Sequence, residues 1–233
     1  MLVVITFIVW FYSGKTFGLT DIEGVEAGTH IRLSENIQLD SYADKISFIA
    51  EPIKQNTTID VLLINDENPL PRGYLPVDLI NLYEQRNRHF QLAKSDISIC
   101  RVVFEAMDSM FCVAQIDGVD GFIITSGYRT FEEQSELYFT RADGTAARPG
   151  TSEHETGLAF DVTAMGDANF ALTPQFEWLS QNCGEYGFIL RYLDGAEGIT
   201  GTPYEPWHYR YVGLPYSKTI MDDGITLEEY LSR

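Results

Sequence analysis

From residue 95 onward, short apolar segments alternate with helical patterns along the chain, and the loops that connect them are short. Apolar residues recur at three- and four-residue spacing in the first of these patterns: Val103, Ala106, Met107, Met110 and Ala114. This spacing predicts an amphipathic helix that ends near Gly118. Several later connections are too short for regular βαβ units. The pattern therefore predicts an α+β fold, with a small, largely antiparallel central sheet flanked by helices.

The remaining elements follow from local signals. Ser95 and Asp96 are good N-cap residues for the first helix. Helices are also expected over 130–142 and 176–187, and a short helix or turn over 77–83. Strands are expected at 59–65, 122–125, 158–164, 188–193 and 207–213.

The first residues have a different composition. The run from Leu2 to Tyr12 is continuously apolar. It is too short to cross a bilayer, which takes about 20 residues, and its extension to Leu19 includes Lys15. We interpret residues 1–19 as a membrane anchor, with a buried strand or a cleaved signal as the alternatives. Residues 20–58 are polar and acidic and predict a stalk, followed by a globular domain over 59–233.

Charge and cysteine content exclude several classes of partner and site. The formal net charge is −18, so phosphate backbones would be repelled and no nucleic-acid partner is expected. The three cysteines, Cys100, Cys112 and Cys183, include no CxxC pair. Neither a disulfide framework nor a thiolate zinc site is therefore indicated, and we expect small buried hydrophobic residues at these positions.

The stretch TSEHETGLAFD places His154 and Asp161 seven residues apart, with Gly157 between them. Imidazole and carboxylate groups are both zinc ligands. Gly157 and the β-prone residues after it argue against a helix, so we expect His154 in a loop and Asp161 on the following strand. Gly157 would let the backbone turn so that the two side chains converge. From this stretch alone, half of a metal site and a pair of side chains that cap nearby amides are equally good interpretations.

A second candidate pair, Glu205 and His208, lies in YEPWHYRYVG. An acid three residues before a ligand histidine can sit beside the metal and accept a proton from its water. Pro206 argues against a helix, and residues three apart in a strand face opposite sides. Both residues can therefore serve one site only if the backbone turns at Pro206 and Trp207. Trp207 itself is expected to be a core aromatic.

Arg129 follows an expected strand in the segment SGYR. A guanidinium at a strand end can pair with a carboxylate or stabilise a developing oxyanion. A surface salt bridge is the alternative.

Taken together, these motifs resemble one family. SEHETGLAFD resembles the S-x-H-x-x-G-x-A-x-D signature of zinc D,D-peptidases, EPWHYRYVG resembles their E-x-W-H motif, and SGYRTFEEQ resembles their S-G-Y-R-[ST]-x-x-x-Q segment. LLINDENPLP resembles their opening strand and loop. In order and spacing the segments are similar to the VanY-type D-alanyl-D-alanine carboxypeptidases, a branch of the lysostaphin-like metallopeptidases, over about residues 59–214.

The resemblance implies a role for each matching residue. His154, Asp161 and His208 would bind a zinc ion on the sheet. Glu205 would be the general base. Arg129 would stabilise the tetrahedral intermediate or hold the scissile carbonyl.

Other positions near the motifs are less strongly assigned by the resemblance. Ser152 and Gln134 match positions that line the substrate site. Glu153 and Glu155 flank His154 and are expected to be bystanders. The loop Leu193–Gly201 is acidic and glycine-rich, where relatives usually carry a lysine, which affects substrate detail and not the zinc site.

The implied activity is that of a zinc D,D-carboxypeptidase that hydrolyses the terminal D-Ala-D-Ala bond of peptidoglycan stem peptides. Residues 59–233 would be the catalytic domain, held by the N-terminal segment at the extracytoplasmic face of the membrane. An L,D-carboxypeptidase of the same fold, a D,D-dipeptidase and a non-catalytic wall-binding domain are the alternatives. The motifs do not distinguish a role in vancomycin resistance from routine wall maturation.

Overall fold

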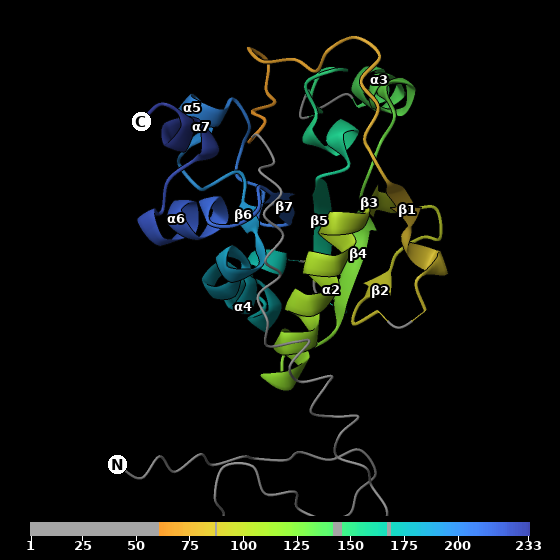
Figure 1. Cartoon of the computed structure of the whole chain (residues 1–233), viewed down its shortest axis with the longest axis vertical. Coiled ribbons are helices and arrows are strands. Elements are labelled where there is room, and N and C mark those ends of the chain that lie inside the picture. Colours follow the sequence, from red (N-terminus) through yellow and green to blue (C-terminus); the bar gives the residue numbers. More distant parts are fainter. Residues whose placement is uncertain (1–60, 87, 142–145, 167–168) are drawn as a thin grey trace, which may run out of the picture. The chain divides into compact units, whose positions relative to one another are not determined.

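The computed structural model describes residues 61–233, apart from 87, 142–145 and 167–168 (Figure 1). The described residues form both helices and strands, and the strands pair in largely antiparallel fashion, so the predicted α+β fold is confirmed.

Two of the expected segments, the anchor over 1–19 and the stalk over 20–58, lie outside the described residues. Within the described part, no helix is both long and apolar enough to span a bilayer.

The fold is built on a five-stranded sheet whose strands lie in the order β2-β4-β5-β7-β6. These strands are β2 (Gln91–Leu92), β4 (Phe122–Ser126), β5 (Ala159–Ala164), β7 (His208–Tyr211) and β6 (Phe188–Leu190). The outer strand β2 runs parallel to β4, and the other three neighbouring pairs are antiparallel. The sheet is therefore largely antiparallel, as the short connections predict.

A separate antiparallel pair, β1 (Leu79–Asn81) with β3 (Ser98–Cys100), lies beside this sheet. Here the prediction of helix start was wrong. The helix begins at Arg101 and not at Ser95, because the preceding residues form β3. The apolar residues Ile97 and Ile99 are buried there, and Ile99 pairs with Ile80 of β1.

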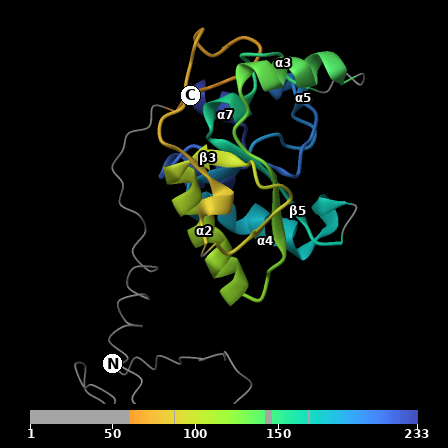
Figure 2. The same cartoon turned by 90° about the vertical axis from the view of Figure 1, so that its right-hand side faces the viewer.

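Helix α2 (Arg101–Ile116) packs along β4 and β5 (Figures 1 and 2). All five residues of the predicted apolar face are buried, as is Phe111. The Phe111 ring stacks on Phe122 with ring centroids 4.5 Å apart and meets Phe160 edge to face at 6.2 Å. The predicted amphipathic face is therefore the one that closes the main core.

A smaller core forms around β6. Phe188 and Leu190 belong to the main core, whereas Ile189 faces Ile220 of α6 (Tyr216–Asp223) and Leu227 of α7 (Leu227–Leu231). This alternation follows from the two-residue period of a strand.

The remaining helices are α3 (Phe131–Thr140), α4 (Pro174–Asn182) and α5 (Glu197–Thr200). Short 3-10 helices are η1 (Leu82–Glu84), η2 (Glu153–Thr156), η3 (Phe170–Leu172) and η4 (Cys183–Tyr186). The strand expected at 59–65 is not formed in its described part, 61–65. The segment 77–83 contributes β1 before it enters η1.

The three cysteines are free thiols. Cys100 and Cys183 are buried, as predicted, and Cys112 is only half-buried.

Candidate metal centre

Two of the predicted ligands, Asp161 and His208, lie on neighbouring antiparallel strands. Asp161 on β5 pairs directly with His208 on β7. Phe160 and Val162, on either side of Asp161, are fully buried in the core, so the Asp161 side chain points to the opposite face of the sheet. Asp161 Oδ1 lies 3.2 Å from His208 Nδ1.

The third predicted ligand, His154, comes from η2, the turn before β5. This turn ends at Gly157, whose φ is 67°. A Cβ atom at this position would lie 2.8 Å from Cys100 Sγ, so both the conformation and the space require glycine. As predicted, the bend brings His154 Nε2 to 3.4 Å from Asp161 Oδ1.

The spacing of the three side chains fits a tetrahedral cation. One ligand atom from each of His154, Asp161 and His208 lies within 4.8 Å of the others. Two ligands about 2 Å from a tetrahedral ion would lie about 3.3 Å apart. The observed carboxylate–imidazole distances of 3.2 Å and 3.4 Å agree with this value. Moreover, the buried Asp161 Oδ1 accepts no hydrogen bond from any of the described residues.

In each imidazole, the nitrogen that points away from Asp161 lies beside a hydrogen-bond acceptor. His154 Nδ1 lies 2.7 Å from the carbonyl oxygen of Gly127, which can only accept, so Nδ1 carries the proton. His208 Nε2 lies 3.3 Å from Glu153 Oε2. Each histidine therefore has an acceptor at its far nitrogen and turns its other nitrogen toward Asp161, which is the arrangement of a metal-binding histidine.

Electrostatics at the cluster favour a cation. Burial opposes ionisation of Asp161, but His154 and His208 outweigh it and hold the pKa of this carboxyl well below its usual range. Burial alone would lower the pKa of His208, but the carboxylates of Asp161 and Glu153 raise it to about 9. Positive charge is thus stabilised at the point where the three side chains meet.

Glu205 lies beside this cluster, with Oε2 3.7 Å from His208 Nδ1. The backbone turns at Pro206 and Trp207, and the His208 amide donates to the Glu205 carbonyl at 3.1 Å. The predicted turn is therefore confirmed. Burial raises the pKa of Glu205 and outweighs the opposing effect of His208, which would suit a group that accepts and returns a proton.

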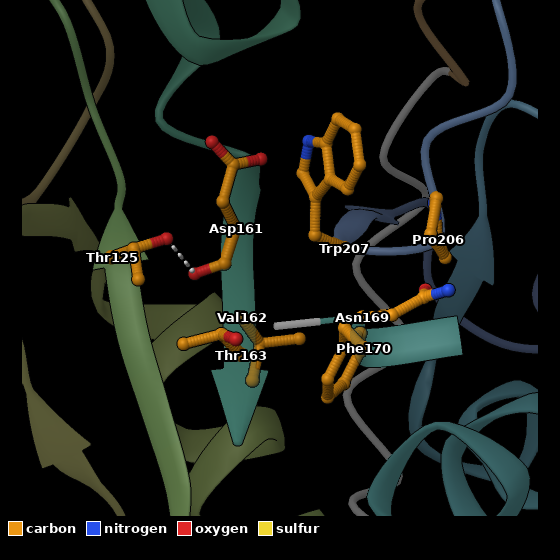
Figure 3. Close-up of a pocket in the computed structure, with 8 residues that line it drawn as sticks. All are labelled: Thr125, Asp161, Val162, Thr163, Asn169, Phe170, Pro206 and Trp207. Carbon is orange, nitrogen blue, oxygen red and sulfur yellow. Dashed lines mark hydrogen bonds between the residues drawn. The ribbon is translucent and has the colours of Figure 1, made fainter. Parts of the chain in front are cut away.

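A cavity of about 330 Å³ opens next to Asp161 (Figure 3). Figure 3 shows Trp207 and Pro206 on one side of the Asp161 carboxylate and Thr125 on the other. Trp207 is 41% exposed, so the expectation of a core aromatic was wrong. Because the chain turns before β7 begins, this ring leaves the core and forms a wall of the cavity. Among the residues that line the cavity, Asp161 belongs to the cluster of predicted metal ligands.

Arg129 is held in place by two side chains. Its Nη1 donates to Gln134 Oε1 at 2.6 Å, and its Nη2 donates to Ser126 Oγ at 3.2 Å. Its backbone amide donates to the His154 carbonyl at 3.2 Å, which ties it to the turn that carries His154. Gln134 is buried and also donates to the Ala147 carbonyl at 2.6 Å. In this arrangement Gln134 orients the guanidinium of Arg129.

Ser152 is buried directly before η2, and its side chain makes no capping bond to that turn. Glu155 is also buried, and its carboxylate accepts from the Gly150 amide at 2.7 Å, so it stabilises the loop.

Glu153 is not the bystander that its position between motif residues suggests. Its side chain is fully buried, and it contacts His208, Arg191 and Arg210. Burial opposes its ionisation, but the two guanidinium groups hold its pKa well below the usual range. Arg191 and Arg210 lie far from Glu153 in the chain, so no local pattern could identify this role.

A protein-family model described as VanY, D-alanyl-D-alanine carboxypeptidase, matches residues 96–214. The chain belongs to this family. Among its relatives, a D-alanyl-D-alanine carboxypeptidase of Enterococcus faecium is 37% identical over 174 residues, which are 74% of this chain and 57% of the relative. The putative carboxypeptidase YodJ of Bacillus subtilis is 33% identical over 192 residues, 77% of this chain and 69% of the relative. The chain thus spans little more than half of the enterococcal relative.

Solved structures of VanY-like peptidases have the same fold. The LdcB LD-carboxypeptidase has a TM-score of 0.65 at 33% identity, covering 73% of this chain and 84% of that one. A vancomycin-resistance D,D-pentapeptidase VanY, in complex with Zn(II), has a TM-score of 0.61 at 35% identity, covering 73% and 98%. VanYB in complex with D-alanine-D-alanine has a TM-score of 0.62 at 35% identity, covering 74% and 97%. These likenesses confirm the predicted fold of the VanY-like peptidase domain.

Proposed function

We propose that this chain is a zinc D,D-carboxypeptidase that removes the terminal D-alanine from peptidoglycan stem peptides. The observation that carries the proposal is the convergence of His154 Nε2, Asp161 Oδ1 and His208 Nδ1 at tetrahedral spacing beside Glu205. The Glu205 carboxylate has no use in a site that only binds. Its position beside His208 therefore favours hydrolysis over a wall-binding role.

Each residue of the candidate site has a distinct task in this proposal. His154, Asp161 and His208 would hold zinc, which would supply Lewis acidity and a water of lowered pKa. Glu205 would take the proton from the attacking water and pass it to the leaving amine. Arg129, fixed by Gln134, would neutralise the charge that develops on the carbonyl oxygen of the scissile bond.

The relatives support this assignment. VanY binds Zn(II) in one solved structure, and VanYB binds D-alanine-D-alanine in another, both at 35% identity to this chain. The motif match also assigns Ser152, which is buried directly before η2, to the proposed substrate site.

The decisive experiment is to incubate the purified full chain with a stem pentapeptide that ends in D-Ala-D-Ala. We expect release of one D-alanine per peptide, loss of this activity with a chelator, and recovery with zinc. Binding of the peptide without any hydrolysis in zinc-loaded protein would favour a non-catalytic domain.

An L,D-carboxypeptidase is the second candidate, because the LdcB LD-carboxypeptidase is a structural neighbour with a TM-score of 0.65. A stem tetrapeptide, whose terminal D-alanine follows an L-centre, separates the two activities. Faster release from the tetrapeptide than from the pentapeptide would replace the first proposal with this one. Free D-Ala-D-Ala serves as a third substrate, and its cleavage would indicate dipeptidase activity.

We further propose that residues 1–19 anchor the enzyme at the extracytoplasmic face of the membrane. The continuous apolar run from Leu2 to Tyr12 and the polar, acidic segment after it support this location. Membrane fractionation of the full chain and of a variant without residues 1–19 tests it. Equal partition of both proteins into the soluble fraction would contradict an anchor.

A further inference from the structure

Behind the metal centre, a chain of ion pairs connects His208 with the C-terminal helix. Glu153 stands closest to the ligand, with Oε2 3.3 Å from His208 Nε2. Its other oxygen, Oε1, lies 2.7 Å from Arg191 Nε and 2.9 Å from Arg210 Nη1. None of the side chains of Glu153, Arg191 and Arg210 is more than 1% exposed.

Arg191 is in turn held by Glu228 on α7. Its Nη1 and Nη2 donate to the two carboxylate oxygens of Glu228 at 2.9 Å and 2.6 Å, so the pair is bidentate. Arg191 also lies over the Tyr192 ring, with Cζ 4.8 Å from its centroid, and that ring packs against His208 with centroids 5.0 Å apart. Arg191 therefore reaches His208 by two routes.

The four charges of this cluster cancel. Glu153 and Glu228 carry two negative charges, and Arg191 and Arg210 carry two positive charges. The Glu153 carboxylate is thus held in place by its guanidinium partners. It lies at His208 Nε2, so that Nδ1 is the nitrogen that faces Asp161 and the proposed ion.

We propose that Glu153, Arg191 and Glu228 form a positioning relay that fixes the His208 imidazole for metal binding, so that helix α7 is part of the metal centre. The relay rests on the zinc site of the proposed function. Glu228 lies beyond residue 214, where the family match ends, so the relay extends the site into a segment that the family match does not include. Each of its three residues would act on the proposed ion through His208.

The relay predicts graded effects on zinc affinity. Removing an outer partner of a metal-binding histidine typically weakens metal binding 10- to 100-fold, so Glu153→Gln should weaken zinc binding by about that factor. Glu228→Gln lies one step further out, and we expect a loss of about 3- to 10-fold. Because both act through the same imidazole, the two losses should be less than additive in the double variant.

Glu229→Gln is a matched control for Glu228→Gln. It removes the same charge from the adjacent position of the same helix, where Glu229 closes a capping box with Thr226 and does not contact Arg191. A general destabilisation of α7 should therefore appear in both variants. Loss of the relay should appear only in Glu228→Gln.

The test measures zinc dissociation constants by competition with a chromophoric chelator, in the full chain, alongside thermal unfolding. We expect weaker zinc binding in Glu228→Gln and unchanged binding in Glu229→Gln. Equal zinc affinity in wild type and Glu228→Gln would overturn the relay, as would equal losses in both variants. If Glu153→Gln fails to fold, Glu228→Gln still tests the relay. The Glu228 side chain is 13% exposed, so this substitution should disturb the fold less than the one at the fully buried Glu153.

A spectroscopic readout separates positioning from stability. In zinc-loaded protein, imidazole nitrogen chemical shifts should place the His208 proton on Nε2, and Glu228→Gln should broaden or shift this signal while that of His154 is unchanged. An unaltered His208 signal would contradict the relay. Zinc affinity is read independently of peptide hydrolysis, so zinc-binding protein that cleaves no peptide would refute the proposed function and leave the relay standing.

Discussion

Asp161 and His208 face each other across β5 and β7, with Asp161 Oδ1 3.2 Å from His208 Nδ1. Their approach is set by the register of two paired strands, which no loop movement can change. A slip of one residue would turn either side chain into the core. His154 is fixed to this rigid pair by the bend at Gly157. The metal centre is thus largely preorganised by the backbone.

Removing a ligand from the rigid pair should abolish zinc binding. In His208→Ala, two side chains remain to hold the ion, and we expect the variant to lose stoichiometric zinc during dialysis. Elemental analysis of the dialysed protein measures this. His89→Ala is the control, since His89 pairs with Asp108 on α2 and should keep its zinc. Full occupancy in His208→Ala would remove this residue from the ligand set.

Glu205→Gln should separate metal binding from turnover. The amide keeps the size of the side chain but cannot accept a proton, so we expect kcat to fall by about 10²- to 10⁴-fold with zinc content unchanged. Glu197→Gln, at an exposed position of α5, should have wild-type activity. D-alanine release under saturating peptide measures both variants. A Glu205→Gln enzyme with full activity would rule out Glu205 as the base.

The sequence predicted those features that depend on local patterns. The buried face of α2 follows from its spacing of apolar residues, and the turn at Gly157 follows from the need for a left-handed residue before β5. The roles of Glu153 and Trp207 depend on distant partners and were missed. The role of Glu153 depends on Arg210 on β7 and on Arg191 directly after β6. The exposure of Trp207 depends on the direction of the turn before β7.

Gln134→Ala should lower activity through Arg129. The change removes the acceptor that holds Arg129 Nη1 at 2.6 Å and leaves His154, Asp161 and His208 in place. Loss of one oxyanion donor costs about 10²- to 10³-fold in kcat, and misplacement of Arg129 should cost less, about 10-fold. Gln175→Ala is the matched control, because it loses a comparable bond, to the Asp120 carbonyl, outside the site. Identical kcat values for the two variants would argue against the orienting role.

The two buried thiols, Cys100 and Cys183, should differ from free cysteine in their response to pH. Burial, with the charge of Asp78, raises the pKa of Cys100 to about 11, and burial raises that of Cys183 to about 12. An unfolded thiol ionises near pH 8.5, so the unfolded chain releases protons first and stability should fall as the pH rises above about 8.5. At pH 8, iodoacetamide should label both residues at least 10-fold more slowly in native than in unfolded protein. Mass spectrometry of the labelled peptides measures this, and rapid native labelling of Cys183 would contradict it.

Truncation of Trp207 should affect mainly KM, and truncation of Trp178 should affect mainly the free energy of unfolding. Trp207 is 41% exposed and walls the cavity beside Asp161, so Trp207→Ala should raise KM for the peptide and cost about 1 kcal/mol of stability or less. Trp178 is 8% exposed and donates to Asp117 at 2.9 Å, so Trp178→Ala should cost about 3–5 kcal/mol in the free energy of unfolding. Urea unfolding and steady-state kinetics measure the two effects. An unchanged KM with a large loss of stability in Trp207→Ala would contradict this prediction. It would indicate that Trp207 supports the fold and that the peptide does not bind in the cavity.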